Sequence, residues 1–201
     1  VCYGFHVIVH PFDGFWDLKH EKRGSVRGAT IILLLTVFTF VYQSVGRGFL
    51  YNKYEGTGVN YVLQISSIVL PVILLTISNW CLTTLFEGEG SFKDILLATC
   101  YALVPLPILM IPSTMLTHIL TLDESSIISL LSTVGFIWTG FLLFFGVMVT
   151  HDYSFGKNII TVLGTLVGMV VIMFLGLLFS GLLGKILSFI TNIYTELSLR
   201  V

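Results

Sequence analysis

Apolar and polar segments alternate along the chain. The runs 28–45, 61–86, 95–120 and 127–149 contain no Asp, Glu, Lys or Arg, and each is at least 18 residues long. A helix rises about 1.5 Å per residue, so roughly 20 apolar residues cross a hydrocarbon core of about 30 Å. The pattern therefore predicts a transmembrane helix in each of these four runs.

A fifth and longer apolar run covers residues 158–192. As a single helix it would be about 52 Å long, which exceeds the thickness of the hydrocarbon core. We therefore expect a fifth span at 159–179, followed by an amphipathic or protruding tail helix near 182–197. An odd number of spans places the two ends of the chain on opposite sides of the membrane.

Prolines interrupt two of the predicted spans. Pro71 marks a kink in the second span, whereas the third span contains Pro105, Pro107 and Pro112. Each proline removes a backbone N–H that lipid cannot replace. We therefore expect the third span to be bent or broken, and to lie where neighbouring helices satisfy its free carbonyl groups.

The segment before the first span has a different pattern. Its sequence His10-Pro-Phe-Asp-Gly-Phe-Trp-Asp-Leu-Lys-His-Glu-Lys-Arg-Gly24 mixes aromatic and charged residues. Aromatic side chains at helical spacing, followed by basic ones, are typical of a helix that lies at the level of the lipid headgroups. The expected interfacial anchors are Phe12, Phe15, Trp16, Lys19, Lys22 and Arg23.

Composition agrees with a membrane protein. Hydrophobic residues make up 55% of the 201 residues and charged residues 10%, and the mean hydropathy is +0.96. The net charge of −1, without a basic segment of any length, argues against nucleic acid as a partner. The prediction is an all-α polytopic membrane protein, a bundle of five transmembrane helices with an amphipathic N-terminal interfacial helix. The interfacial segment covers residues 1–27 and the membrane domain residues 28–201.

Basic residues near the span ends predict the orientation. Six lie on the amino-terminal side and four on the other side, so we expect a cytoplasmic amino terminus and a carboxyl terminus outside. The first group is Lys19, Lys22, Arg23, Arg27, Lys93 and Lys157, and the second is Arg47, Lys53, Lys185 and Arg200.

Few residues carry chemistry. The five apolar cores hold no ionisable group, apart from His118 near the end of the third span, and no hydrolase or phosphate-binding motif is present. We therefore expect no enzyme and no cofactor. His6 and His10, four residues apart, are candidate metal ligands together with Asp13, but an interfacial helix explains the same residues without a metal.

Small residues recur in the last apolar run at steps of four or eight. Such spacing lets another helix backbone approach closely. We favour packing within the monomer over a homodimer contact, because the bundle has its own interior to fill. The residues are Gly164, Gly168, Gly176, Ser180 and Gly184.

Three segments resemble the Yip1 family of five-span membrane proteins, specifically its bacterial branch. They are the stretch His10–Gly24 quoted above, Gly90-Ser-Phe-Lys93 followed by Tyr101-Ala-Leu-Val-Pro105, and His151-Asp-Tyr-Ser-Phe-Gly-Lys157. The resemblance implies an integral protein of the cytoplasmic (inner) membrane of a bacterium, without catalysis. Eukaryotic relatives are associated with membrane traffic and bind prenylated GTPases, but this chain lacks their Asp-Leu-Tyr-Gly-Pro signature.

The resemblance and the uncharged spans together favour one function. We expect a non-enzymatic membrane interaction or membrane-organising protein that binds lipid and another membrane protein. The alternative is an accessory subunit or passive conduit of a solute transporter, for example of the ABC type, and a homo-oligomer is a further alternative. An enzyme acting on lipids would have to use His10, Asp13, Asp17 and His20 together.

Overall fold

The computed structural model describes residues 2–21, 23–52 and 58–198, and this part of the chain is helical without strands. Five helical stretches are long and apolar enough to cross a membrane, as the sequence predicted. The elements are α1 (Cys2–Val9), α2 (Pro11–His20), α3 (Val26–Val45), the 3₁₀ turn Phe49–Tyr51, α4 (Tyr61–Thr83), α5 (Phe92–Ala102), α6 (Pro105–Leu116), the 3₁₀ turn Leu122–Glu124, α7 (Ser125–His151) and α8 (Phe155–Ser198).

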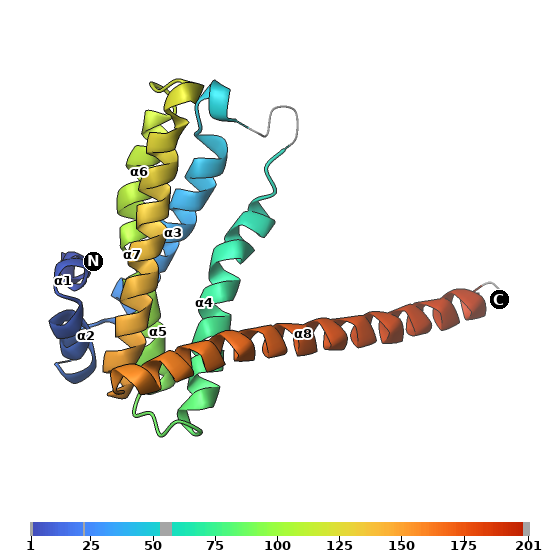
Figure 1. The fold of residues 1–201 in the computed structure, drawn as a ribbon. Helices are drawn as coiled ribbons and strands as arrows, with labels where there is room; N and C mark the ends of the chain where they lie inside the picture. The colour runs from blue at the N-terminus through green and yellow to red at the C-terminus, as the bar shows by residue number, and fades with distance from the viewer. Residues whose placement is uncertain (1, 22, 53–57, 199–201) are drawn as a thin grey trace.

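Four of these stretches run alongside one another, and the fifth does not. Figure 1 shows α3, α4, the consecutive helices α5 and α6, and α7 as one bundle, while α8 crosses the lower end of the bundle and projects away from it. The five-helix bundle expected from the sequence is thus a four-stretch bundle with a crosswise α8. Buried positions of α8 lie in its first part, at Asn158, Thr161 and Thr165, and the helix is exposed from Met173 onwards to Glu196.

The stretch formed by α5 and α6 lies at the centre. About 72% of its apolar window is buried, compared with 33% or less in the other four stretches. The helix is interrupted at Leu103 and Val104, directly before Pro105. The amides of Leu103 and Val104 donate to the carbonyls of Cys100 and Tyr101. The carbonyls of Cys100 and Tyr101 thus accept 3₁₀ hydrogen bonds from the same chain segment. We had expected neighbouring helices to supply the donors for such carbonyls.

Local signals explain how the helices begin. Ser91 and Asp94 form a reciprocal capping box at the start of α5, as their spacing suggests. Asn60 accepts a hydrogen bond from the amide of Leu63 at the start of α4. Pro71 lies inside α4, which continues on both sides of it. Pro107 and Pro112 likewise lie within α6.

Helix α8 differs from the predicted span with a separate tail. It is continuous from Phe155 to Ser198, through the region 180–182 where we expected a boundary. No proline or polar turn occurs there, and one glycine in a helix costs only about 1 kcal/mol. An uninterrupted helix is therefore the natural state of this sequence, even though its length exceeds the membrane thickness.

Candidate functional site

A buried chain of hydrogen bonds, here called the polar network, connects α4, α7 and α8 at the lower end of the bundle. His151 at the end of α7 is 2% exposed, and its Nε2 lies 2.7 Å from Oδ1 of Asn79 in α4. The amide of Asn79 donates to Oγ1 of Thr165 in α8, at 3.0 Å. The hydroxyl of Ser78 donates to the backbone carbonyl of Thr165, at 2.7 Å. Two side chains of α4 thus hold one turn of α8.

The hydrogen-bond directions fix the protonation of His151. The amide of Gly90 donates to its Nδ1, at 3.3 Å, so Nε2 carries the proton and donates to Asn79. The hydroxyl of Thr165 in turn donates to the carbonyl of Thr161. Each link then has one donor and one acceptor, with a neutral imidazole. A Cβ at Gly90 would lie 2.9 Å from the imidazole, so this close approach depends on glycine.

The polar network has a positioning role. The small space that His151 and Asn79 line together is too tight for a water molecule, whereas a larger, mainly apolar cavity of about 250 Å³ also reaches Asn79 and Thr165. A buried and matched set of polar groups specifies one arrangement of the helices that carry it. The imidazole bonds to the Asn79 amide and stacks on the ring of Tyr153, with centroids 5.0 Å apart, so these contacts hold the end of α7 against α4.

The small residues of α8 divide into two groups. Gly164 faces Leu82, and Gly168 faces Ser78 so closely that an added Cβ would overlap its hydroxyl. Gly176 and Gly184 have no atom of the described chain within 4 Å of an added Cβ. The first pair therefore packs within the monomer, and the second pair is open.

The open part of α8, residues 173–196, is here called distal α8. Every side chain from Met173 to Glu196 is exposed. Lys185 and Glu196 are its charged residues, and its large apolar side chains point in every direction. Figure 1 shows this stretch clear of the bundle. Distal α8 is therefore an exposed helix that lies outside the bundle.

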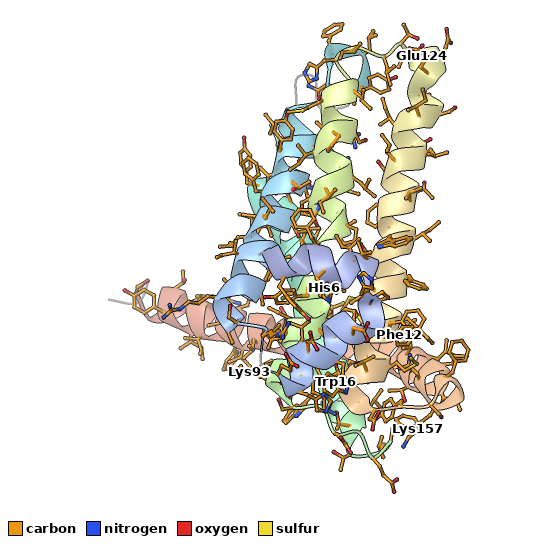
Figure 2. All side chains as sticks on the ribbon, turned by 90° about the vertical axis from the view of Figure 1, so that its left-hand side faces the viewer. His6, Phe12, Trp16, Lys93, Glu124 and Lys157 are labelled. Atoms are coloured by element: carbon orange, nitrogen blue, oxygen red, sulfur yellow. The ribbon has the colours of Figure 1, made fainter. Side chains whose placement is uncertain are left out.

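The predicted interfacial anchors have different environments. Phe15 is 1% exposed and its ring lies against Gly146 of α7, so it belongs to the core. Phe12 and Trp16 are about half exposed, at 49% and 50%. Phe12 contacts Phe145 of α7 edge to face. Helices α1 and α2 thus pack on the side of the bundle, with Phe15 buried and with Phe12 and Trp16 half exposed (Figure 2).

The basic anchors form ion pairs. Lys19 lies 3.1 Å from Glu89, and Arg23 lies 2.6 Å from Glu21 and 3.5 Å from Asp17. Lys22, Lys53 and Arg200 lie outside the described residues. The structure therefore describes five of the six basic residues expected on the amino-terminal side of the membrane and two of the four expected on the other side. Exposed pairs of this kind contribute about 0–1 kcal/mol, so they orient α2 more than they stabilise it.

Tyr3 closes α1 onto α2. Its hydroxyl donates to the carboxylate of Asp17, at 2.9 Å. Burial, and then the hydrogen bond to Asp17, raise the pKa of Tyr3, so the phenol stays protonated. Asp17 is therefore occupied by Tyr3 and Arg23 and is not available for the lipid chemistry that the sequence allowed.

The candidate metal ligands do not assemble into a ligand set. The rings of His6 and His10 are stacked with centroids 5.2 Å apart. In the described part of the chain, no three His, Cys, Asp or Glu side chains are placed to hold a metal ion together. The His6–His10 pair with Asp13 is thus two stacked surface rings followed by an acid on the next helix.

Sequence reasoning missed the polar network. Asn79 was one of several neutral polar residues in the second span, and His151 was a loop residue just beyond the fourth. One signal in the sequence did point to two residues of the polar network. Gly90 and His151 each begin a segment that resembles the Yip1 family. The helix ends that carry these residues are far apart in sequence, so their spacing alone could not pair them.

Fold and site together define an integral membrane protein of the all-α class with a clamped, projecting helix. The family model described as the Yip1 domain matches residues 5–191, and the chain therefore belongs to the Yip1 family. Neither the curated proteins nor the solved structures gave a match to this chain.

Proposed function

We propose that this protein is a non-enzymatic membrane interaction protein that binds another integral membrane protein through distal α8. The carrying observation is that a long apolar helix leaves the bundle and is exposed from Met173 to Thr195. A helix that is apolar on all sides does not suit the water interface, where one polar face is needed. It must therefore be covered by lipid or by another protein.

Three small residues favour a protein as the cover. Gly176, Ser180 and Gly184 are all exposed and follow one another at four-residue steps. Lipid chains cover large and small side chains equally, whereas small residues let a second helix backbone come close and gain van der Waals contact. Distal α8 therefore has a segment suited to helix pairing.

The polar network supports this use of α8. Asn79, Ser78 and Thr165 fix the direction in which α8 leaves the bundle. A helix held in place before binding loses less conformational freedom when a partner arrives. These hydrogen bonds would therefore hold distal α8 in a position where another membrane protein can bind it.

The test is recovery of a partner from native membranes in mild detergent after cross-linking. Gly176→Ile, Ser180→Ile and Gly184→Ile together should lower recovery at least roughly tenfold, the effect of about 1.4 kcal/mol. The matched control replaces Leu175, Phe179 and Leu183 with isoleucine at the same depth on another face, and should recover the partner normally. A monomer without a partner in stoichiometric amount would refute the proposal, and cross-linking to a second copy would make the complex a homo-oligomer.

A solute transporter is the second candidate as partner. The sequence suggested it because irregular helix at membrane depth is tolerated where it lines a cavity or is buried in protein. Leu103 and Val104 at the break are 7% and 8% exposed, so burial in protein is the relevant case. This favours an accessory subunit over a conduit, and flux in vesicles that contain the chain alone would contradict it.

The proposal places the lower end of the bundle on the cytoplasmic side of a bacterial inner membrane. Lys93 and Lys157 lie at the same end of the molecule as Trp16, while Glu124 lies at the opposite end (Figure 2). Basic residues near span ends prefer the cytoplasm. The supporting argument is this clustering of charge at one end.

A further inference from the structure

A cavity of about 330 Å³ lies between α2 and the end of α7, apart from distal α8. It is lined by three aromatic residues, two acids, one histidine and two aliphatic residues: Phe12, Trp16, Tyr153, Asp13, Asp152, His20, Met148 and Val149. This volume is at the lower end of the range for small-molecule sites, which is roughly 300–1,000 Å³. The cavity therefore has room for a compact polar group.

The two acids of the cavity lie outside the ion pairs of this region. In the part of the chain that the structure describes, Lys19 and Arg23 pair with other acids, and neither Asp13 nor Asp152 has an ion-pair partner. Two carboxylates beside one cavity repel each other and favour a cation between them. The cation that fits is one that also tolerates apolar walls.

Aromatic walls are such an environment. Phe12 and Trp16 are half exposed beside the two acids, and Trp16 is held by stacking on His20, with ring centroids 4.6 Å apart. The face of an aromatic ring attracts an ammonium group, with Trp the strongest. Acids and aromatic rings together are the chemistry that recognises substituted ammonium ions.

The backbone at Asp152 holds the acid in an unusual conformation. Asp152 caps the end of α7 with φ of 56°, in the left-handed region that glycine or asparagine usually occupies. A residue with a Cβ adopts this conformation only at an energetic cost. Asparagine tolerates it, which makes Asp152→Asn a replacement that removes charge without changing the backbone requirement.

The position of the cavity favours a lipid as the source of the ammonium group. Trp16 lies at the end of the bundle where Lys93 and Lys157 gather (Figure 2), the level at which headgroups and interfacial tryptophans are found. Lys157 lies 4.9 Å from the ring centre of Tyr153, a residue that lines the cavity. A lipid that carries both an ammonium and a phosphate group would meet acids and a lysine in the same place.

We propose that the cavity between α2 and the end of α7 binds the headgroup of a zwitterionic phospholipid. Asp13 and Asp152 hold the ammonium group, Phe12 and Trp16 cover it, and Lys157 pairs with the phosphate. This site is independent of partner binding by distal α8.

The experiment is native mass spectrometry of the full chain in mild detergent, with phosphatidylethanolamine, phosphatidylcholine or phosphatidylglycerol of identical acyl chains added. The wild type should retain the two zwitterionic lipids at least roughly tenfold better than phosphatidylglycerol, because one charge-assisted contact contributes about 1.4 kcal/mol or more. Asp13→Asn with Asp152→Asn should remove this preference. Asp123→Asn, which removes a carboxylate near the opposite end, should keep it.

Two further arms decide the remaining outcomes. Trp16→Leu removes an aromatic wall and no charge, and should also weaken retention, so a folding defect of the double variant would not leave the site untested. Equal retention of phosphatidylglycerol, or full retention in both the double variant and Trp16→Leu, would overturn the proposal. Displacement of lipid by free ethanolamine at millimolar concentration would show a site for a soluble amine and would overturn the assignment to lipid.

Discussion

Replacing Asn79 with leucine should destabilise the protein by removing the centre of the polar network. Leucine has the branched shape of asparagine but cannot accept the proton of His151 Nε2. The other tautomer of His151 does not help, because its Nδ1–H would face the N–H of Gly90. The Nε2–H tautomer therefore leaves one buried donor unpaired, and the Nδ1–H tautomer leaves two.

The expected loss follows from that donor. A buried polar group without a partner costs about 1–3 kcal/mol. For a chain of this length, 1 kcal/mol corresponds to a Tm shift of roughly 2–4 °C, so we expect Tm to fall by roughly 2–12 °C. The measurement is thermal unfolding of the purified chain in detergent, followed by tryptophan fluorescence and circular dichroism.

A second substitution distinguishes a lost hydrogen bond from a packing defect. His151→Phe leaves the Asn79 oxygen and the Gly90 amide without a partner, whereas the double variant leaves only the Gly90 amide. The double variant should therefore lose less stability than the sum of the two single variants, by about 1–3 kcal/mol.

The control is Asn192→Leu, the same replacement at an exposed position of α8, which should leave Tm unchanged. Additive losses in the double variant would show that Asn79 and His151 act independently. An unchanged Tm for Asn79→Leu alone would show that water or a rearranged backbone satisfies His151. Either result would refute the polar network as a coupled set of hydrogen bonds between α4 and α7.

Other substitutions test the surrounding packing. Gly168→Val should cost about 1–3 kcal/mol, because its added atoms overlap the Ser78 hydroxyl, whereas Gly176→Val should leave Tm unchanged; equal shifts would contradict the assigned contacts. Phe15→Ala should cost about 3–5 kcal/mol and free α2 for proteolysis, but Phe12→Ala should cost far less, and the reverse order would return Phe15 to the membrane surface. A phosphatase reporter fused to the carboxyl terminus, active only outside the cytoplasm, should be active; cytoplasmic fluorescence from a fused fluorescent protein would invert the orientation.

The sequence alone determined the membrane class and the number of apolar stretches. Hydrocarbon acts on each segment separately, because every residue of a span needs apolar character and an internal backbone partner. Contacts within one helix could also be predicted without knowing the fold. Examples are the Ser91–Asp94 capping box and the hydrogen bond from the Thr76 hydroxyl to the Val72 carbonyl.

Only the tertiary structure decided which polar residues matter and where the aromatic residues go. Phe15 has the same helical spacing as Phe12 and Trp16, and only Gly146 on a distant helix makes room for its ring. Asn79 bonds to residues 72 and 86 positions away, a pairing that no local pattern contains. The course of α8 likewise depends on those bonds. A segment's length and polarity are local properties, whereas the choice of partner depends on which surfaces folding brings together.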